Sequence, residues 1–597
     1  MNGNGAVVLG VERSLTGKRW ETSPADDRIA QALSQRHGLS DIVSRVLVAR
    51  GVAIETVGSF LNPSLRDLLP DPAVLQDMEK AATRLADAVR SGQTIGIFGD
   101  YDVDGATSAA VLQRFIHAVG GRVEIYVPDR LREGYGPNLP ALLEMQAGGV
   151  GVIVTVDCGI TAFDPLSGAS DAGIDVVVVD HHAAEARLPM AVAVVNPNRL
   201  DDESAQGQLA AVGVSFLLVV ALNRKLRDLG HYKTVPEPNL MQWLDLVALG
   251  TVCDVVPLTG LNRALVAQGL KVMARRDNVG LRALSDVAAI DEAPTTYHAG
   301  FILGPRVNAG GRVGESSLGA RLLTTNDPEE ARGLALQLDG WNKERRELEA
   351  VCLEEAIEQV ERSGMRDGLV YASAENWHAG VIGIVAGRLK DRYNRPACVV
   401  ARDGGVGKGS GRSISGVDLG AAVLAARQSE LLVNGGGHPM AAGFTVATET
   451  EEAFREFLGE HIERQVGPRG VVRRLHIDAA VQPAGATTEL ALDLARIAPF
   501  GAGNPEPRLV LPYARVAKAD VVGENHVRCF LTGEGGGRLK AISFRSLGEP
   551  HGDALLKSAG LPLHLAGHIR VDRWQGREEA QLIIEDVAEA AQAPLQS

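Results

Sequence analysis

The sequence is poor in cysteine and lacks the spacings that give cysteine a structural role. Its five cysteines, among 597 residues, lie far apart, and no two form a Cys-x-x-Cys pair. This pattern predicts neither a zinc site nor a disulfide framework. It fits a protein kept in a reducing cytoplasm.

Targeting and membrane-spanning signals are also lacking. The chain starts MNGNGAVVLGVERS, without the basic segment and long apolar core of a secretory signal. The longest strongly apolar stretch, Val212 to Leu222, is well short of the roughly 20 residues that span a bilayer. We therefore expect a cytoplasmic protein that does not engage a membrane.

Basic charge is in deficit, because 74 acidic residues outnumber 60 lysines and arginines, for a net charge of −14. This argues against a generally basic surface for nucleic acid, although a local basic groove can coexist with an acidic exterior.

Common catalytic signatures are missing too. The run GKGSG lacks the Gly-Lys-Ser/Thr ending of a P-loop, and the sequence contains no HExxH and no G-x-S-x-G motif.

What the chain does contain is an alternation of apolar strands and helical stretches that begins near Thr94. Near-continuous apolar runs such as VGVIVTV and DVVVV, separated by helical patterns, are typical of a parallel sheet covered on both faces. We predict a doubly wound α/β core over about residues 90–200, followed by helices at Leu209–Leu229, Leu240–Leu249 and Leu261–Arg275. A long charged helix is predicted over Leu338–Arg362.

Acidic residues gather where the predicted strands end. Asp100, Asp102 and Asp104 follow the first strand, Asp157 follows VGVIVTV, and Asp180-His181-His182 follows DVVVV. Ligands of open α/β sheets bind beyond the carboxyl ends of the strands. Crowded carboxylates repel one another unless a cation is present. A solvated acidic turn is the simpler interpretation of the first run, but three strand ends delivering such residues favour a metal site.

The run DYDVDG also copies the first half of an EF-hand loop, which needs a glutamate at its twelfth position. Counted from Asp100, that position is Val111, and the run follows a strand, so we reject an EF-hand.

Asp254, at the end of an apolar helical run, is either a further ligand or an ordinary helix-terminal aspartate. Four or more carboxylates with one imidazole suit two Mn²⁺ or Mg²⁺ ions that share a ligand and hydrolyse a phosphate ester.

The ordered motifs GDYDVDG, TVDCGI, DHH and GTVCDVVPL resemble the DHH phosphoesterase superfamily. Within it, the downstream segments GPRVNAGGR, WHAGVIGIVAGRL, GGGHPMAAG and PFGAGNPEP resemble the bacterial exonucleases specific for single-stranded DNA. The resemblance implies five segments: a mainly helical N-terminal segment (1–90), a doubly wound parallel-sheet DHH catalytic domain (91–335), a connector helix (336–365), a smaller α/β DHH-associated phosphate-binding domain (366–467) and an OB-like β-barrel that binds single strands (468–597).

The resemblance also implies residue roles. Asp102 and Asp157, helped by Asp100, would hold one Mn²⁺, with Mg²⁺ as the alternative ion. Asp104, Asp157, His181 and Asp254 would hold the other, and Asp157 would bridge the two. His182 would face the scissile phosphate, which makes Asp104, Asp157 and His182 the catalytic group. In some relatives a histidine lies four residues before the first shared aspartate, but Phe98 occupies that position here.

Phosphate contacts are expected from basic and glycine-rich segments on the approach to the centre. The substrate-binding residues implied by the resemblance are Arg306, Asn308, Arg312, His378, Arg388, Arg412, Ser413, Gly436, Gly437 and His438. The alternative interpretation is that these glycines form turns, that His438 is a structural cap and that His378 packs in a core. In the barrel, Tyr513, Phe530, Phe544 and Trp574 are the main aromatics available to stack on bases.

The implied activity is 5′ to 3′ degradation of single-stranded DNA in repair and recombination, by a monomer that works with a single-strand-binding protein and a helicase. Two alternatives stay open. A nanoRNase, cyclic-dinucleotide phosphodiesterase or pyrophosphatase would need only the two α/β domains, whereas the extra C-terminal region favours a polymer substrate. A catalytically inactive DNA-binding scaffold should have lost acids from the cluster, and here every matched aspartate is present.

Overall fold

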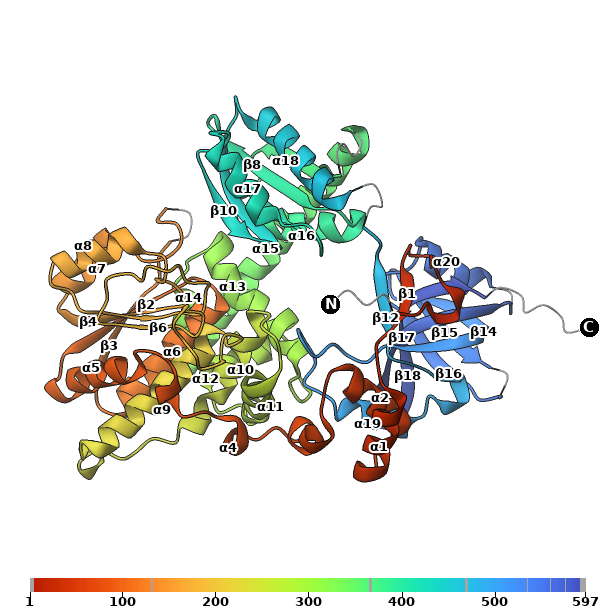
Figure 1. Cartoon of the computed structure of the whole chain (residues 1–597), viewed down its shortest axis with the longest axis horizontal. Helices are drawn as coiled ribbons and strands as arrows, with labels where there is room; N and C mark the ends of the chain where they lie inside the picture. The colour runs from red at the N-terminus through yellow and green to blue at the C-terminus, as the bar shows by residue number, and fades with distance from the viewer. Residues whose placement is uncertain are drawn as a thin grey trace, which may run out of the picture. The chain divides into compact units, whose positions relative to one another are not determined.

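The structure is a computed structural model that describes residues 5–129, 132–363, 368–467, 471–533, 535–558, 560–574 and 576–590. The chain forms two compact units. One is Leu68–Val471, and the other combines Met1–Asp67 with Val472–Ser597 (Figure 1). Two of the predicted segment boundaries, at residues 365 and 468, fall outside the described residues.

The larger unit begins with a five-stranded parallel sheet in the order β3-β2-β4-β5-β6. The strands are β2 (Thr94–Gly99), β3 (Arg122–Tyr126), β4 (Val150–Val156), β5 (Val176–Val179) and β6 (Ala193–Val195). Helices cover both faces (Figure 1): α5 (Met78–Ser91), α6 (Val103–Ala118), α7 (Leu139–Ala147), α8 (Phe163–Asp171) and α9 (Ala211–Asp228). Side chains of α7 and α8 form one buried core with Phe98, Ile153 and Val178 of the sheet. The predicted doubly wound α/β core is confirmed.

A helical region follows the sheet. It contains α10 (Leu244–Cys253), α11 (Gly260–Met273), α12 (Val279–Val287), the π-helix η6 (His298–Leu303), α13 (Gly304–Val313), α14 (Leu318–Thr324) and α15 (Pro328–Ser363). The predicted long charged helix therefore starts ten residues earlier, at Pro328. Its first turns bury Leu334 and Leu338, because this part of α15 packs on α13 and α12 before the helix leads to the next sheet.

The second sheet of this unit is mixed, in the order β10-β11-β9-β8-β7, with only β7 and β8 parallel. Its strands are β7 (Val370–Glu375), β8 (Ala397–Asp403), β9 (Val406–Arg412), β10 (Asn434–His438) and β11 (Ala441–Ala447). The accompanying helices are α16 (Ile382–Tyr393), α17 (Leu419–Gln428) and α18 (Glu451–Val466). This confirms the predicted second, smaller α/β domain. Among the described residues of the whole chain, no helix has the length and hydropathy needed to cross a bilayer.

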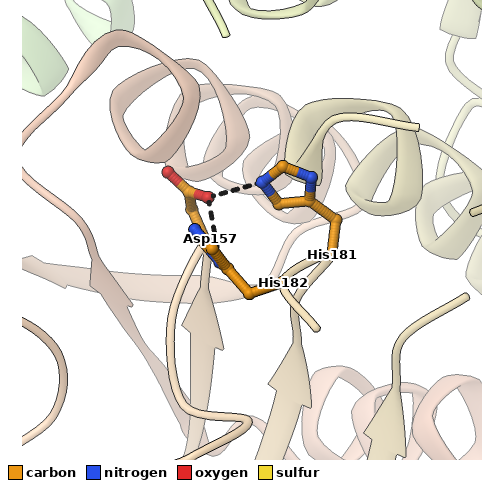
Figure 2. A group of neighbouring side chains, drawn as sticks. All are labelled: Asp157, His181 and His182. Carbon is orange, nitrogen blue, oxygen red and sulfur yellow. Dashed lines mark ion pairs between the residues drawn. The ribbon is translucent and has the colours of Figure 1, made fainter. Parts of the chain in front are cut away.

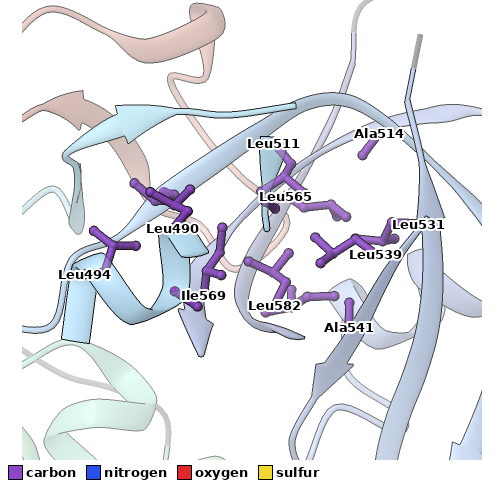
Figure 3. Packing of buried hydrophobic residues seen from close by; sticks show 14 of the residues in the cluster. Leu490, Leu494, Leu511, Ala514, Leu531, Leu539, Ala541, Leu565, Ile569 and Leu582 are labelled. Carbon is purple, nitrogen blue, oxygen red and sulfur yellow. The ribbon is translucent and has the colours of Figure 1, made fainter. Parts of the chain in front are cut away.

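The smaller unit is a β-barrel closed by pairing between β14 and β17. Its strands run in the order β14 (Leu509–Val522), β15 (His526–Thr532), β16 (Leu539–Ser543), β18 (Arg577–Glu589) and β17 (Pro562–Trp574). Alternate residues such as Val527, Cys529 and Leu531 point inward and form the apolar core seen in Figure 3. The predicted OB-like barrel is confirmed.

The first residues of the chain complete this smaller unit. The sequence predicts mainly helix here, and α1 (Asp27–His37) and α2 (Asp41–Ala49) share the barrel core. A strand was not predicted, but β1 (Arg19–Thr22) pairs in parallel with β12 (Arg474–Ile477). Trp20 of β1 is fully buried and donates a 2.8 Å hydrogen bond from Nε1 to Asp586 of the barrel.

Candidate metal centre

The acidic residues lie where the strand order of the parallel sheet reverses. β2 lies between β3 and β4, so the chain moves to one side after β2 and to the other side from β4 onward. Such a switch point leaves a crevice at the carboxyl ends of the two central strands, where ligands of this fold class bind. Asp100 and Asp102 follow β2, and Asp157 follows β4.

Asp102 and Asp104 are fixed by the start of two helices. Asp102 is the N-cap of α6, where its Oδ1 accepts hydrogen bonds from the backbone N–H groups of Asp104 (2.9 Å) and Gly105 (3.0 Å). The buried carboxylate of Asp104 accepts from Ala211 N (2.6 Å) and Val212 N (2.9 Å) at the N-terminus of α9, which stabilises negative charge. The packing needs Gly105, because a Cβ there would lie 2.4 Å from the carbonyl oxygen of Asp100.

Asp157 lies at the centre of the group and adopts a strained backbone. Its φ of 60° is in the left-handed region, which costs a non-glycine residue about 1–3 kcal/mol and is concentrated at functional sites. Figure 2 shows both imidazoles directed at its carboxylate. The Oδ1 atom lies 3.3 Å from His181 Nε2 and 4.0 Å from His182 Nδ1.

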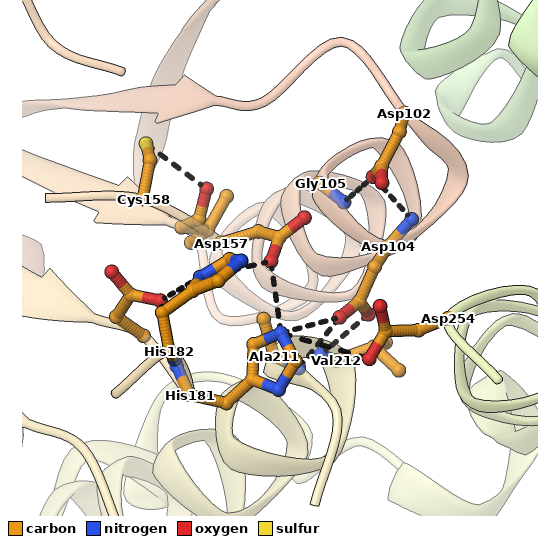
Figure 4. Close-up of polar contacts among 12 residues, drawn as sticks. Asp102, Asp104, Gly105, Asp157, Cys158, His181, His182, Ala211, Val212 and Asp254 are labelled. Atoms are coloured by element: carbon orange, nitrogen blue, oxygen red, sulfur yellow. Dashed lines mark hydrogen bonds and ion pairs between the residues drawn. The ribbon is translucent and has the colours of Figure 1, made fainter. Parts of the chain in front are cut away.

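Asp254 reaches the same place from the helical region, as the C-cap of α10. Its Oδ2 lies 3.6 Å from His181 Nε2, which is itself 3.9 Å from Asp104 Oδ2 (Figure 4). Gly250 of α10 allows this approach, since a Cβ there would lie 2.2 Å from Thr107 Oγ1 of α6. Four separate segments thus converge on one volume.

Three overlapping sets of ligand atoms, each within 4.8 Å of one another, could hold cations. They are Asp100–Asp102–Asp157, Asp104–His181–Asp254 and Asp157–His181–His182. In the part of the chain that the structure describes, His181 Nε2 and Asp254 Oδ2 are buried and have no hydrogen-bond partner. Buried polar atoms are normally satisfied, so these two atoms point to a ligand between them. Oxygen donors with one imidazole fit Mn²⁺ or Mg²⁺.

The electrostatics of the group also call for a cation. Burial, with the charges of neighbouring aspartates, raises the pKa values of Asp104 and Asp157 well above their usual range. Burial and the nearby charge of Asp102 raise the pKa of Asp254 to about 7. Burial and the adjacent His182 lower the pKa of His181 to about 4, so its ring is neutral and can donate a lone pair to a metal. Bound cations would restore the ionised carboxylates.

His182 has a different partner, the buried carboxylate of Asp180. Its Nδ1 lies 2.7 Å from Asp180 Oδ1, while Asp180 also accepts from the N–H groups of Ile160 (3.0 Å) and of His181 (2.7 Å). Burial disfavours charge on both groups. The hydrogen bond between them nevertheless raises the pKa of His182 and lowers that of Asp180. The pair therefore presents a half-exposed imidazole, held by Asp180, beside Asp157.

Three residues that the sequence does not single out support these histidines. The Tyr135 hydroxyl donates to the carbonyl of Asp157 (3.0 Å) and lies 3.4 Å from His182 Nδ1. Asn196 and Asn198, after β6, donate to the carbonyls of His182 (2.9 Å) and His181 (2.5 Å). The Asn-Pro-Asn run could have been noted as the end of another strand of the sheet, but Tyr135 lies in a loop without a comparable signal.

The predicted substrate-binding residues lie in several separate places. Arg312 donates to the carbonyl of Gly380 (3.1 Å), and His378 accepts from the N–H of the same glycine (3.1 Å), so these two come together where α13 meets the loop between β7 and α16. Arg306 pairs with Asp339 of α15 at 3.0 Å, and Asn308 is half-buried on α13.

The remaining members belong to the second sheet and its helices. Arg388 is exposed and pairs with Glu349 of α15 (3.2 Å), while Arg412 donates to Ser410 Oγ (3.2 Å). Ser413 is buried and donates to the carbonyl of Val417 (2.8 Å), which gives its hydroxyl a structural partner. The glycine-rich segment of β10, which contains Gly436, Gly437 and His438, is an exposed edge strand.

Three family models match successive parts of the chain. They are described as the DHH family N-terminal domain (residues 94–251), the DHHA1 domain (residues 366–466) and the RecJ OB domain (residues 477–586). The first covers the parallel sheet with Asp100 to His182, and the third covers the barrel.

Curated relatives match over most of the chain. It is 33% identical over 576 residues to the single-stranded-DNA-specific exonuclease RecJ of Bacillus subtilis, covering 96% of this chain and 71% of the relative. It is 39% identical over 542 residues to the enzyme of the same name from Dickeya dadantii, covering 88% and 92%. Among solved structures, it is similar to RecJ from Thermus thermophilus in complex with Mn²⁺, with a TM-score of 0.80, 29% identity and coverage of 95% of this chain and 79% of the other.

Proposed function

The chain belongs to the RecJ family, and from that membership we propose that it is a metal-dependent exonuclease that hydrolyses phosphodiester bonds of single-stranded DNA. The observation that carries the proposal is the convergence of Asp102, Asp104, Asp157, His181 and Asp254 at the switch point of the parallel sheet. Similarity to RecJ structures that hold Mn²⁺ and Mg²⁺ supports the choice of ion.

Two cations fit the arrangement of donors. Asp100 and Asp102 would hold one cation, and Asp104, His181 and Asp254 would hold the other. Asp157 would contribute to both, because its carboxylate belongs to the first set and lies 3.3 Å from His181 of the second. When bound, the pair of cations activates water and neutralises charge that develops on the phosphate.

The chain's own residues then position the substrate. His182, held by Asp180, would face the scissile phosphate and stabilise its negative charge. Tyr135 and the strained backbone of Asp157 hold the bridging carboxylate in place. The basic residues Arg312 and Arg412 and the exposed edge of β10 would contact phosphates of the following nucleotides.

A polymer substrate is supported by the outer face of the barrel. Phe530 of β15 pairs across the sheet with Lys518 of β14 and Lys540 of β16, and the Arg538 guanidinium lies 4.1 Å from its ring centroid. An aromatic ring among cations is the combination that binds single strands without sequence preference. Phe530 is half-buried and Tyr513 and Phe544 are exposed, whereas the side chain of Trp574 lies outside the described residues.

Further aspects of the proposal rest on family membership. We propose 5′ to 3′ polarity, a role in DNA repair and recombination, action as a monomer, and a single-strand-binding protein and a helicase as partners. A cytoplasmic location is supported by the five cysteines, all of which are free thiols.

Product analysis on 5′- and 3′-labelled single strands, with Mn²⁺ and with chelator, tests the proposal. We expect mononucleotides from the 5′ end with Mn²⁺ and no cleavage with chelator. Asp157→Ala should abolish cleavage while leaving binding of the strand measurable, because it removes the shared ligand. Faster hydrolysis of a dinucleotide than of the oligonucleotide, or near wild-type turnover by Asp157→Ala, would contradict the proposal.

A further inference from the structure

Two aromatic side chains are exposed beside the last turn of α10. Tyr297 is 58% exposed and Phe301 is 74% exposed, and their rings stack on each other with centroids 5.5 Å apart and planes 25° apart. Aromatic side chains usually contribute to folding by being buried, so a self-stacked and exposed pair has no evident role in stability. Exposed apolar clusters in soluble proteins commonly mark binding surfaces.

The two rings lie in line because their residues are four positions apart along a helical segment. Tyr297 is the N-cap of the π-helix η6 and Phe301 lies within it, and helical residues four apart are neighbours on one face. Such π-helical turns are rare and frequently occur at functional sites. We therefore treat Tyr297 and Phe301 as one aromatic pair.

The base of this pair is rigid. His298, the residue after Tyr297, is buried. Its Nδ1 accepts a hydrogen bond from the N–H of Thr295 (3.0 Å), and its Nε2 lies 3.2 Å from Glu292. The Tyr297 ring also meets the edge of the His298 ring, with centroids 5.8 Å apart. A ring that is already immobilised loses little conformational entropy when it binds a ligand.

The aromatic pair is attached directly to the helix that carries Asp254. The thiol of Cys253, the residue before Asp254, donates to the carbonyl of Ala299 at 3.5 Å, and Ala299 lies two residues from each ring. Gly300 and Gly304 keep this contact close, since a Cβ on Gly304 would lie 2.4 Å from the Cys253 sulfur. The pair is therefore held at the end of α10 that enters the metal centre.

Positive charge accompanies the pair. Arg306 donates to the carbonyl of Ile302, the residue after Phe301, at 2.7 Å. Arg306 and Lys343 share a single carboxylate, that of Asp339, at 3.0 Å and 2.8 Å, and the carboxylate of Glu292 lies beside His298 at 3.2 Å. Stacked aromatic rings near the basic side chains of Arg306 and Lys343 match the chemistry of a nucleic-acid strand, in which flat bases alternate with phosphates.

We propose that Tyr297 and Phe301 form a stacking platform for one nucleobase of the strand whose phosphate lies in the metal centre. This inference rests on the proposed function, because it takes single-stranded DNA as the ligand. The platform would fix the position of a nucleotide near the scissile bond without selecting its sequence, since every base has a π-face.

The test combines a ring-removing variant with strands that lack one base. Affinity is measured by fluorescence anisotropy with chelator present, so that no strand is cleaved, and KM and kcat are measured with Mn²⁺. The strands are 5′-phosphorylated and carry a single abasic nucleotide at successive positions from the 5′ end. Phe301→Leu removes the ring but keeps apolar bulk, Phe301→Trp keeps a ring, and Leu143→Ala on α7 is a control that alters another exposed apolar side chain.

For the wild type, we expect an abasic nucleotide at one position to raise Kd and KM by roughly tenfold, with kcat changed by less than about twofold. Phe301→Leu should bind the intact strand as weakly as the wild type binds the abasic one, and it should be insensitive to the abasic nucleotide at that position. Phe301→Trp should restore both properties, and Leu143→Ala should match the wild type.

Unchanged Kd and KM in Phe301→Leu, or an abasic profile that matches the wild type, would overturn the platform. If the wild type binds strands in this position-dependent manner but cleaves none with Mn²⁺, the platform stands and the proposed hydrolysis falls. A pair that docks a protein partner would leave every measurement on the purified enzyme unchanged, which would also overturn the inference.

Discussion

Replacing Asp254 by asparagine should stabilise the metal-free protein and destabilise the metal-bound one relative to wild type. The side chain is 21% exposed, and burial with the charge of Asp102 raises its pKa from an ordinary 3.8 to about 7. Each pKa unit is worth about 1.4 kcal/mol, so the ionised carboxylate costs the metal-free fold up to about 4 kcal/mol. Screening by the solvent at its exposed edge lowers this to about 2–4 kcal/mol.

The sign of the pH dependence follows from the direction of this shift. Because the folded pKa lies above the unfolded value, the folded state holds the proton more tightly. The free energy of unfolding of the wild type should therefore fall as pH rises from about 4 to about 7, and the penalty is complete above that range. In chelator, Asp254→Asn should be more stable by about 1 kcal/mol at about pH 4.5 and by about 2–4 kcal/mol at about pH 8.

Mn²⁺ should reverse this order at the higher pH. At a thousand times its Kd, a ligand that binds only the folded state stabilises it by about 4.1 kcal/mol, which offsets the advantage of about 2–4 kcal/mol that the variant has in chelator. The variant gains less from the ion because it lacks one donor of the set Asp104–His181–Asp254. Urea unfolding followed by tryptophan fluorescence is a suitable measurement, because three of the five tryptophans, Trp243, Trp341 and Trp377, lie in the larger unit.

A matched control lies at the start of the same helix. Burial raises the pKa of Asp245 to about 6, but Asp245 belongs to none of the three donor sets. Asp245→Asn should therefore stabilise the protein by a similar amount with chelator and with Mn²⁺. The reasoning is refuted if Asp254→Asn shows the same stability difference at both pH values, or if Mn²⁺ stabilises it as much as the wild type.

Three further outcomes are expected from other parts of the chain. Asp180→Asn should lower kcat by about 10- to 100-fold with little change in KM, because it loosens the imidazole of His182; unchanged steady-state kinetics would exclude this positioning role. Phe530→Ala should raise the Kd for single strands by roughly five- to thirtyfold in anisotropy titrations while kcat at saturation holds, and equal affinity would remove the ring from the binding face. Trp20→Ala should destabilise the smaller unit by about 3–5 kcal/mol in denaturant titrations, and a loss below about 1 kcal/mol would contradict its role in the core.

The sequence predicts those parts of the fold that local patterns determine. Apolar runs such as VGVIVTV are long enough to specify β4, and parallel strands deliver their last residues to one edge of the sheet. The proximity of Asp100, Asp102 and Asp157 therefore follows from two strand ends alone. Asp254 is different, because its approach depends on how α10 packs against α6 through Gly250, and here only the motif resemblance indicated it.

Contacts between distant segments could not be predicted in the same way. β1 is four residues long, and its partner β12 lies at the other end of the chain, so no local periodicity specifies the pairing. The support of the two histidines by Asn196 and Asn198 is formed by side chain to backbone hydrogen bonds, which leave no periodic signal. Tyr135 was missed for the same reason.

The parallel pairing of β1 with β12 has a consequence for how the protein is made. A ribosome adds about 5–20 residues per second, so Trp20 is made about 20 to 90 seconds before its partner Leu475. During that interval the barrel strands do not yet exist, and the intervening unit, Leu68–Val471, is synthesised in full before them. Assembly of the smaller unit thus comes after synthesis of the larger one, and a nascent chain that stalls between Leu475 and the last barrel strand leaves an indole uncovered for chaperones to recognise.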